Sequence, residues 1–381
     1  MRYYIVAGEA SGDLHASNLM KALKERDPGA VFRFWGGDLM SAAGGELVTH
    51  YKDMAFMGFW EVFKNLPAVI GNIRRCKRDI AAFNPDALVL VDYPGFNLRI
   101  AEFAKKRGIT TVYYISPQVW AWKKGRIRKI RRDVDEMMVI LPFEKDFYSK
   151  NGMNVHYVGH PLLDAVDKNI ASAPETVSFR KSNGLSDKDI IALLPGSRRQ
   201  EVEAILPRML EVVGDFPQYQ FVVSTVPWLK PDLYENLMRG HDVRPVCGGT
   251  YALLSNSKAA IVASGTATLE TALIGTPQVV CYAGSELSYI IAKHLVSGIS
   301  YISLVNLIMD KGVVTELIQH DLNRERLRAE LEAITADESN IAAMKDDYGK
   351  LRAILGGGSA SGKAASIVAG AAAGRTSRTK T

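Results

Sequence analysis

Residues 260–282 read AIVASGTATLETALIGTPQVVCY, and this stretch decides the fold class. The apolar run 261–263 predicts a strand buried on both faces, and 279–282 predicts a second strand. Between them, 268–274 predicts a helix that ends at Gly275. A strand, a loop of small residues, a helix and another strand form the repeating unit of an α/β protein with a parallel sheet.

The loop in the middle of this stretch, Ser264-Gly265-Thr266, is a candidate anion site. The start of a helix presents unpaired N–H groups and the positive end of the helix dipole, and both attract phosphate. Gly265 lets a ligand approach the backbone, and the two hydroxyls add donors. Glu270 lies about one turn into the helix, where a carboxylate suits ribose hydroxyls. A capped helix without a ligand explains the same residues, so both interpretations stay open.

The same pattern recurs along the whole chain. Predicted strands lie at 3–7, 87–91, 110–115, 136–141, 155–159, 190–194, 219–224 and 243–246. A helix is expected from about Val314 and charged helical sequence over 324–355. We predict two doubly wound, Rossmann-like domains facing across a cleft, at 1–165 and 166–344, with a C-terminal helix at 345–372 completing the first.

Polar residues follow several of these strands, where ligands bind in open α/β sheets. Asp92 follows the strand 87–91 and is either a turn former or a general base. Glu9 and Asp13 in the first loop would repel phosphate and suit a sugar hydroxyl, although Asp13 also fits a helix cap. In the second half, Arg198 of the loop PGSR is a candidate clamp for a diphosphate. The division suggests a nucleotide-activated donor on one domain and an acceptor with a base on the other.

Two surface features have more than one interpretation. An apolar patch is either a buried helix or a site for acyl chains or a bilayer, and its members are Met54, Phe56, Met57, Phe59, Trp60 and Phe63. A basic stretch beside Trp120 fits nucleic acid, anionic lipid, a phosphorylated substrate or a solvated helix face. Its members are Lys123, Lys124, Arg126, Arg128, Lys129, Arg131 and Arg132.

The composition is that of a soluble globular protein, with 47% hydrophobic and 23% charged residues and a net charge of +6. The three cysteines have no metal-ligand spacing, which favours buried thiols in a reducing compartment. The sequence contains no signal-peptide pattern and no apolar run near the roughly 20 residues of a spanning helix. We therefore expect a cytoplasmic protein, or one bound to a membrane surface.

Eight motifs in one order resemble the lipid-A-disaccharide synthase family, glycosyltransferases of the GT-B fold, over the chain to about residue 355. They are AGEASGDLH (7–15), VDYPGFN (91–97), SPQVWAWKKGRIRKI (116–130), LPFEKDFY (141–148), VGHPLLD (158–164), LLPGSRRQEV (193–202), ASGTATLE (263–270) and SLVNL (303–307). The resemblance implies an inverting transfer that joins UDP-2,3-diacylglucosamine to 2,3-diacylglucosamine 1-phosphate (lipid X). The product would be the β-1,6-linked disaccharide 1-phosphate of lipid A biosynthesis, with release of UDP. It also implies a peripheral place on the inner face of the cytoplasmic membrane, no metal or other cofactor, and a homodimer as one state the family allows.

The resemblance also implies residue roles. Asp92 matches the proposed catalytic acid residue, and Glu9 matches an acidic position near the reacting centre. The acceptor side would include Ser11, Asp13 and the apolar patch, and the basic stretch would face anionic lipid or the acceptor phosphate. The donor site would comprise Gly196, Ser197, Arg198, Ser264, Gly265, Thr266, Glu270 and Asn306.

The chain departs from the family pattern at Gly95, where a second acid often follows the catalytic aspartate. Two rival enzymes share the fold: the transferase that makes the lipid-linked peptidoglycan disaccharide and UDP-N-acetylglucosamine 2-epimerase. The first normally has a GGTGGH-type loop, where this chain has AGEASGD. The second would need acidic and histidine residues for proton abstraction at C2; His15 and His160 are available but lie in motifs that are better explained otherwise. A non-catalytic lipid- or nucleotide-sugar-binding protein would keep the donor loops but need no base.

Overall fold

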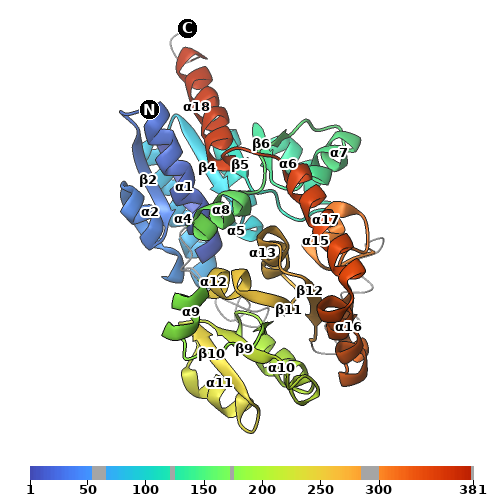
Figure 1. Ribbon diagram of the computed structural model, residues 1–381. Helices are drawn as coiled ribbons and strands as arrows, with labels where there is room; N and C mark the ends of the chain where they lie inside the picture. Colours follow the sequence, from blue (N-terminus) through green and yellow to red (C-terminus); the bar gives the residue numbers. More distant parts are fainter. Residues whose placement is uncertain (54–65, 121–124, 172–175, 285–299, 379–381) are drawn as a thin grey trace. The chain divides into compact units, whose positions relative to one another are not determined.

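The computed structural model of the protein describes residues 1–53, 66–120, 125–171, 176–284 and 300–378 (Figure 1). The chain divides into two compact units: unit 1 comprises Met1–Pro161 and Gly357–Thr381, and unit 2 comprises Leu162–Gly356. In the described residues each unit contains one fully parallel sheet covered by helices. The predicted fold class, two doubly wound domains, is confirmed.

Unit 1 has the strand order β3-β2-β1-β4-β5-β6-β7. Its strands are β1 (Arg2–Ala7), β2 (Val31–Gly36), β3 (Glu46–His50), β4 (Ala87–Val91), β5 (Thr111–Tyr114), β6 (Glu136–Val139) and β7 (His156–Tyr157). Its helices are α1 (Ala10–Arg26), α2 (Asp38–Ala43), α4 (Leu66–Phe83), α5 (Pro94–Lys106), α6 (Arg126–Asp133), α7 (Pro142–Lys150) and α18 (Ala360–Arg378), with a 3-10 turn at Tyr51–Asp53. The order reverses between β1 and β4, and such a switch point is where ligands bind in open α/β sheets.

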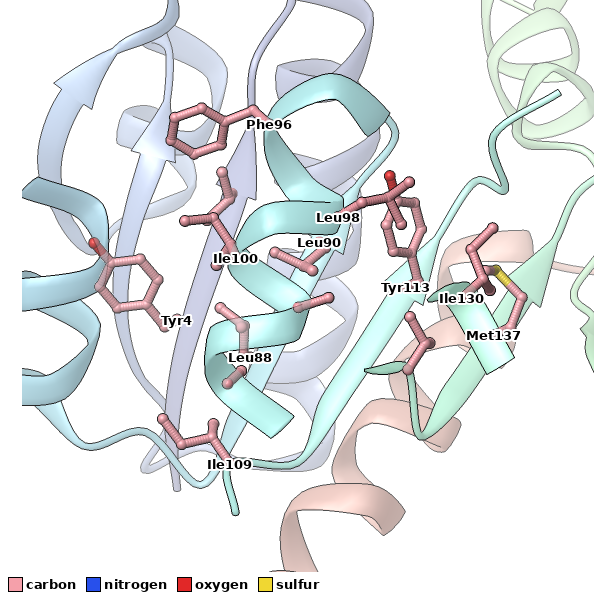
Figure 2. Close-up of a cluster of buried hydrophobic side chains, with 14 of the residues drawn as sticks. Tyr4, Leu88, Leu90, Phe96, Leu98, Ile100, Ile109, Tyr113, Ile130 and Met137 are labelled. Carbon is pink, nitrogen blue, oxygen red and sulfur yellow. The ribbon is translucent and has the colours of Figure 1, made fainter. Parts of the chain in front are cut away.

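The sheet of unit 1 is buried on both faces because its strands carry apolar side chains in both directions. On β4, Leu88 and Leu90 point to one face while Val89 and Val91 point to the other. Figure 2 shows the first face, where Leu88 and Leu90 pack with Tyr4 and Tyr113 against Ile100 of α5. The second face is covered by α1 and by α18, which lies beside α1 (Figure 1).

Unit 2 has the strand order β10-β9-β8-β11-β12-β13, and the order reverses between β8 and β11. Its strands are β8 (Ile190–Leu194), β9 (Gln220–Thr225), β10 (Val243–Cys247), β11 (Ser257–Ala263), β12 (Gln278–Tyr282) and β13 (Glu316–Ile318). Its helices are α8 (Pro161–Ala171), α9 (Thr176–Ser182), α10 (Arg199–Leu210), α11 (Pro231–Met238), α12 (Thr250–Ser255), α13 (Thr266–Ile274), α15 (Leu304–Met309), α16 (Arg324–Ala336) and α17 (Glu338–Leu355), with 3-10 turns at Val213–Asp215 and Gln319–Asp321.

The division between the units differs from the predicted boundaries. It falls at Pro161 and at Gly357, whereas the sequence placed it at 165 and 345. Helix α17 continues through residue 355 because its buried side packs on α13, α15 and α16, all in unit 2. The chain then breaks at Gly356, whose φ of 78° suits glycine, and only α18 joins unit 1.

Three further features differ from expectation. The helix expected from about Val314 is wrong, because Glu316–Ile318 pairs in parallel with β12 as strand β13. The charged segment 324–355 is two helices, separated at Asp337, whose carboxylate caps α17. The thiols of Cys76 and Cys281 are buried as expected, but Cys247 is exposed.

Candidate active site

A cavity of about 490 Å³ opens at the switch point of unit 2. The pairing of Leu194 with Val262 aligns the ends of β8 and β11, so the loops that follow these strands lie together. The lining residues are Leu194, Gly196, Ser197, Arg198, Glu201, Ser224, Val226, Thr250, Tyr251, Ala263, Ser264, Gly265, Thr266, Ala267 and Glu270. The cavity thus brings together all the predicted donor-site residues except Asn306.

One wall of this cavity is the beginning of α13. Strand β11 ends at Ala263, and the helix begins at Thr266 after the Ser264-Gly265 turn. Gly265 precedes the helix and no side chain caps its first N–H groups. Uncapped N–H groups and the positive helix end make this wall suitable for a phosphate group.

The opposite wall is the loop that begins α10. The carboxylate of Glu201 accepts hydrogen bonds from the backbone N–H groups of Ser197 at 3.1 Å and Arg198 at 3.2 Å. The guanidinium of Arg198 donates to the same carboxylate at 2.9 Å, although its side chain is 70% exposed. Gly196, with a φ of 110°, lets this carboxylate approach, because a Cβ there would lie 2.7 Å from Oε2 of Glu201. The backbone of Arg198 is therefore fixed at the cavity, while its exposed guanidinium can turn toward a bound anion.

Glu270 lies on α13 within the same cavity. The hydroxyl of Tyr251 on α12 donates to its Oε1 at 2.7 Å. Burial raises the pKa of Glu270, and the hydrogen bond from Tyr251 acts in the opposite direction. A largely buried carboxylate with a free acceptor side suits hydroxyl donors rather than phosphate oxygens.

The side chain of Asn306 makes its hydrogen bonds within unit 2. Its Nδ2 donates to the carbonyl of Val314 and to the carboxylate of Glu316, at 2.8 and 2.9 Å. Its Oδ1 accepts from the N–H groups of Val313 and Val314 at 2.8 and 3.0 Å. The side chain is 1% exposed, so it fixes the turn before β13 and is not among the described residues that line the cavity.

In unit 1 the switch point carries Asp92. Ala7 pairs with Val91, so the loop after β1 and the loop after β4 lie side by side. Burial first, and then the charge of Glu9, raise the pKa of Asp92 to about 6, while the N–H of Tyr93 lowers it. A carboxyl group with a pKa near 6 is suited to accept a proton close to neutral pH.

The other predicted residues of this loop have different surroundings. Glu9 is exposed, makes no capping hydrogen bond at the start of α1, and is close enough to Asp92 to affect its pKa. Ser11 is exposed on the first turn of α1. Asp13 is buried, and its oxygens accept from the N–H groups of Gly37, Leu39 and Met40 at 2.8, 3.0 and 3.1 Å. Asp13 therefore caps α2 rather than its own helix.

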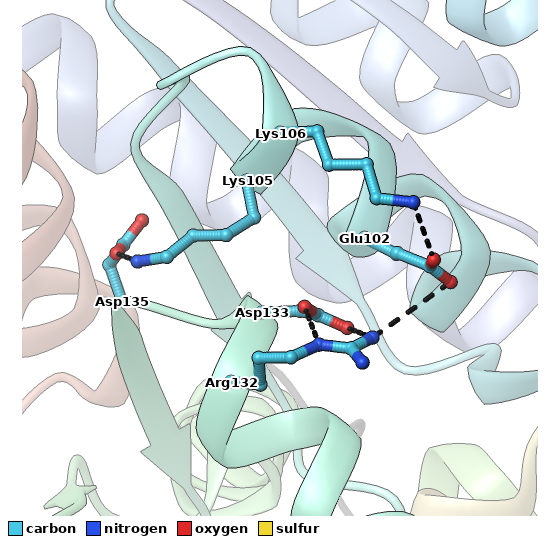
Figure 3. Close-up of polar contacts among 6 residues, drawn as sticks. All are labelled: Glu102, Lys105, Lys106, Arg132, Asp133 and Asp135. Carbon is cyan, nitrogen blue, oxygen red and sulfur yellow. Dashed lines mark hydrogen bonds and ion pairs between the residues drawn. The ribbon is translucent and has the colours of Figure 1, made fainter.

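The basic stretch is described from residue 125 onward. Ile127 and Ile130 of α6 are buried, while the basic side chains of Arg128, Lys129 and Arg131 are exposed. Arg132 is paired with Asp133 at 2.6 Å and lies 4.0 Å from Glu102 of α5. Figure 3 shows these three side chains together. Arg126 is partly buried. Lys123, Lys124 and the apolar patch with Met54, Phe56, Met57, Phe59, Trp60 and Phe63 lie outside the described residues.

Two properties of the described residues bear on cofactors and membranes. No group of three or more His, Cys, Asp or Glu side chains there could hold a metal ion. No helix there is long and apolar enough to cross a bilayer.

Two units, each with one parallel sheet and one switch point, define a fold class, that of GT-B proteins. The UDP-GlcNAc 2-epimerase of Methanocaldococcus jannaschii, solved in complex with UDP-GlcNAc and UDP, has a TM-score of 0.63 at 14% identity, covering 97% of this chain and 99% of that one. The calicheamicin glycosyltransferase CalG4 has a TM-score of 0.59 at 13% identity, covering 97% and 98%. At these identities the likeness concerns the fold alone, which is that of GT-B proteins.

Sequence similarity decides which member of this class the chain is. The family described as lipid-A-disaccharide synthetase matches residues 3–369. The lipid-A-disaccharide synthase of Syntrophus aciditrophicus is 43% identical over 361 residues, which are 92% of this chain and 93% of that one. The chain belongs to the lipid-A-disaccharide synthetase family, and it is a glycosyltransferase of lipid A biosynthesis. The epimerases therefore share its fold and not its family.

One arrangement in the site was not predicted. Asn97 and Tyr113 contact the backbone of Asp92, although they stand 5 and 21 residues further along the chain. Asn97 is the last residue of the motif VDYPGFN, and this was the only signal that could have indicated it.

Proposed function

We propose that the enzyme joins UDP-2,3-diacylglucosamine to 2,3-diacylglucosamine 1-phosphate (lipid X) and releases UDP. The product is the β-1,6-linked disaccharide 1-phosphate. The cavity at the switch point of unit 2 supports this proposal most directly. It combines an uncapped helix start, an exposed guanidinium at Arg198 and a carboxylate at Glu270, which fit the diphosphate and the ribose of a nucleotide sugar.

In the proposed transfer, Asp92 is the general base. The 6-hydroxyl oxygen of the acceptor attacks C1 of the donor sugar from the face opposite UDP, and the configuration inverts. The hydroxyl proton moves to the carboxylate of Asp92, and the C1–O bond breaks with its electron pair going to the diphosphate. A base of this kind contributes about 10²–10⁴-fold to the rate.

The charge on the departing diphosphate is met by Arg198 and the start of α13. Positive groups fixed where negative charge develops stabilise the transition state more than the ground state. We propose on this basis that the reaction needs no metal ion. Burial raises the pKa of Asp92 above its usual range, and the charge of Glu9, a second carboxylate nearby, raises it further.

We also propose that the enzyme binds the inner face of the cytoplasmic membrane. The exposed side chains of Arg128, Lys129 and Arg131 on α6 favour anionic lipid headgroups. Sedimentation with vesicles of phosphatidylglycerol tests this, and a variant with all three residues changed to glutamine should stay in solution. Equal sedimentation of the variant would refute the assignment. A homodimer stays a prediction of the family resemblance.

The central test uses purified protein with radiolabelled lipid X and UDP-2,3-diacylglucosamine in detergent. Formation of a labelled disaccharide phosphate is expected, and its absence would refute the proposed reaction. Asp92→Asn should bind UDP with unchanged affinity but lose most turnover. A near-normal rate for Asp92→Asn would show that another group removes the proton.

A further inference from the structure

Asp92 has an unfavourable backbone conformation. Its φ is 44° and that of Tyr93 is 48°, so two consecutive residues with side chains occupy the left-handed region. A residue with a side chain disfavours this region because its Cβ comes close to the following carbonyl oxygen. Strain of this kind persists only where surrounding groups fix the backbone, and it is commonest at functional sites.

The backbone carbonyl of Asp92 is held by two buried side chains. Nδ2 of Asn97 donates to it at 2.7 Å, and the hydroxyl of Tyr113 donates to it at 2.6 Å. A carbonyl oxygen has two lone pairs, so both are used. The N–H of Asp92 donates to the carbonyl of Tyr114 at 3.0 Å. Both backbone groups of Asp92 are thereby fixed.

The two donors are themselves immobile. Asn97 and Tyr113 are both 0% exposed. Nδ2 of Asn97 also lies 3.2 Å from the carbonyl of Val91 and 3.4 Å from that of Val6, which joins the ends of β4 and β1 to the same amide. Tyr113 lies in the cluster between the sheet and α5, and Figure 2 shows it beside Leu98. The rigid sheet therefore sets the position of the Asp92 carbonyl.

The second strained residue is held from the other side. The ring of Tyr93 stacks on Phe96, with 5.7 Å between centroids. It also lies against Gly8, where a Cβ would be 2.3 Å from Cδ1 of the ring. The turn is therefore supported on both flanks.

We propose that Asn97 and Tyr113 are positioning residues, which hold the backbone of Asp92 so that its carboxylate is aimed at the acceptor hydroxyl. This inference rests on the proposed role of Asp92 as the base. Proton transfer requires the base within hydrogen-bond reach of the hydroxyl, and a displacement of about 1 Å can cost about 100-fold in rate. The two hydrogen bonds leave the carboxylate itself untouched, so they affect chemistry and not substrate binding.

Tyr113→Phe tests the inference because it removes one hydrogen bond and keeps the buried ring. The expected result is a kcat lowered about tenfold or more, with the KM of both substrates within about twofold of the unchanged enzyme. Tyr114→Phe is the matched control, since Tyr114 is equally buried on the same strand and belongs to the cluster on the opposite face of the sheet. The control should keep kcat. A kcat for Tyr113→Phe equal to that of the control would overturn the inference.

A double substitution separates positioning from a general loss of structure. If Tyr113 acts through Asp92, then Tyr113→Phe in an Asp92→Asn background should cause no further loss of kcat. If the two substitutions together lower kcat by the product of their separate factors, the hydroxyl of Tyr113 acts independently of Asp92, and this too would overturn the inference. Asn97→Ser should behave as Tyr113→Phe does in both backgrounds. If Asp92→Asn alone keeps its turnover, Asp92 is not the base, and both the proposed mechanism and this inference are refuted. If Asp92→Asn loses its turnover but Tyr113→Phe is fully active, only the positioning role of Tyr113 is refuted.

Discussion

The raised pKa of Asp92 predicts that the residue lowers the stability of the folded protein at working pH. Its pKa is about 6 against an ordinary value of 3.8, so the native state binds a proton more tightly than the unfolded chain does. The favourable contribution of this proton is fully present below about pH 4 and is lost as the pH rises through about 6. Above that pH, a charged carboxylate stays partly buried beside the negative charge of Glu9. Asp92→Asn should therefore stabilise the protein at pH 8 although it loses most of its turnover.

The magnitude follows from the shift. A rise of about two pKa units corresponds to about 3 kcal/mol at most, since each unit is worth about 1.4 kcal/mol. For a unit of this size, each kcal/mol raises the melting temperature by about 2–4 °C. The gain should be near its maximum at pH 8 and much smaller at pH 4, which lies below the folded pKa of about 6 and close to the ordinary value of 3.8. Asparagine also tolerates the left-handed conformation, so it adds no strain.

The assay is calorimetry of both proteins from pH 4 to pH 8. Asp79→Asn in the same unit is a control of opposite sign. Burial raises the pKa of Asp79, but the hydrogen bonds from Arg33 and Tyr4 outweigh it and hold the pKa below its usual range. Its contribution to stability is present above the ordinary pKa and lost in acid, so Asp79→Asn should lower the melting temperature at pH 8. A melting temperature of Asp92→Asn that differs from the unchanged protein by the same amount at pH 4 and pH 8 would refute the reasoning.

Three other outcomes are expected. Glu9→Gln removes a negative charge near Asp92 and lowers the pKa of Asp92, so the acidic limb of the pH profile of kcat/KM should move to lower pH. An acidic limb at the same pH in both enzymes would show that the charge of Glu9 does not affect the base. Glu270→Gln should raise the Kd for UDP about tenfold in calorimetric titrations and leave that for pyrophosphate unchanged, because it weakens a hydrogen bond to ribose and not to phosphate. Equal losses for both ligands would contradict this. Excess EDTA should leave turnover unchanged, and recovery of a lost rate by Mg²⁺ would contradict metal independence.

The sequence located buried strands well because such strands are short apolar runs between turn residues. The predicted bounds of 87–91 and 190–194 coincide with β4 and β8. Strands β2 and β3 received no assignment. Arg33 interrupts the apolar run of β2, and most side chains of β3 are exposed or partly so. Strand β13 has three residues and was taken for a helix because its sequence, Glu316-Leu317-Ile318, has no period of its own. Pairing with β12 decides its conformation.

Most residues that line the cavity of unit 2 could be predicted, because they follow buried strands directly and such loops meet at one edge of a parallel sheet. Asp13 and Asn306 were harder, because a carboxylate or an amide satisfies buried backbone groups as readily as it binds a ligand. Their partners lie in other segments, at 37–40 and 313–316. The hydrogen bonds from Asn97 and Tyr113 to the backbone carbonyl of Asp92 could not be predicted either. Every residue has a backbone carbonyl, and the two donors differ in residue type and in their distance along the chain from Asp92.

The return of α18 to unit 1 has a consequence for synthesis on the ribosome. The chain leaves unit 1 at Pro161 and re-enters it only at Gly357, so all of unit 2 is made in between. Until then, one face of the first sheet lacks the side chains of Ala364, Ala365 and Val368 that cover it. Unit 2 has every strand of its own sheet in one continuous segment and can fold during translation. The nascent first domain must keep an apolar face from aggregating for nearly two hundred residues, and a chaperone that binds such faces is expected to hold it.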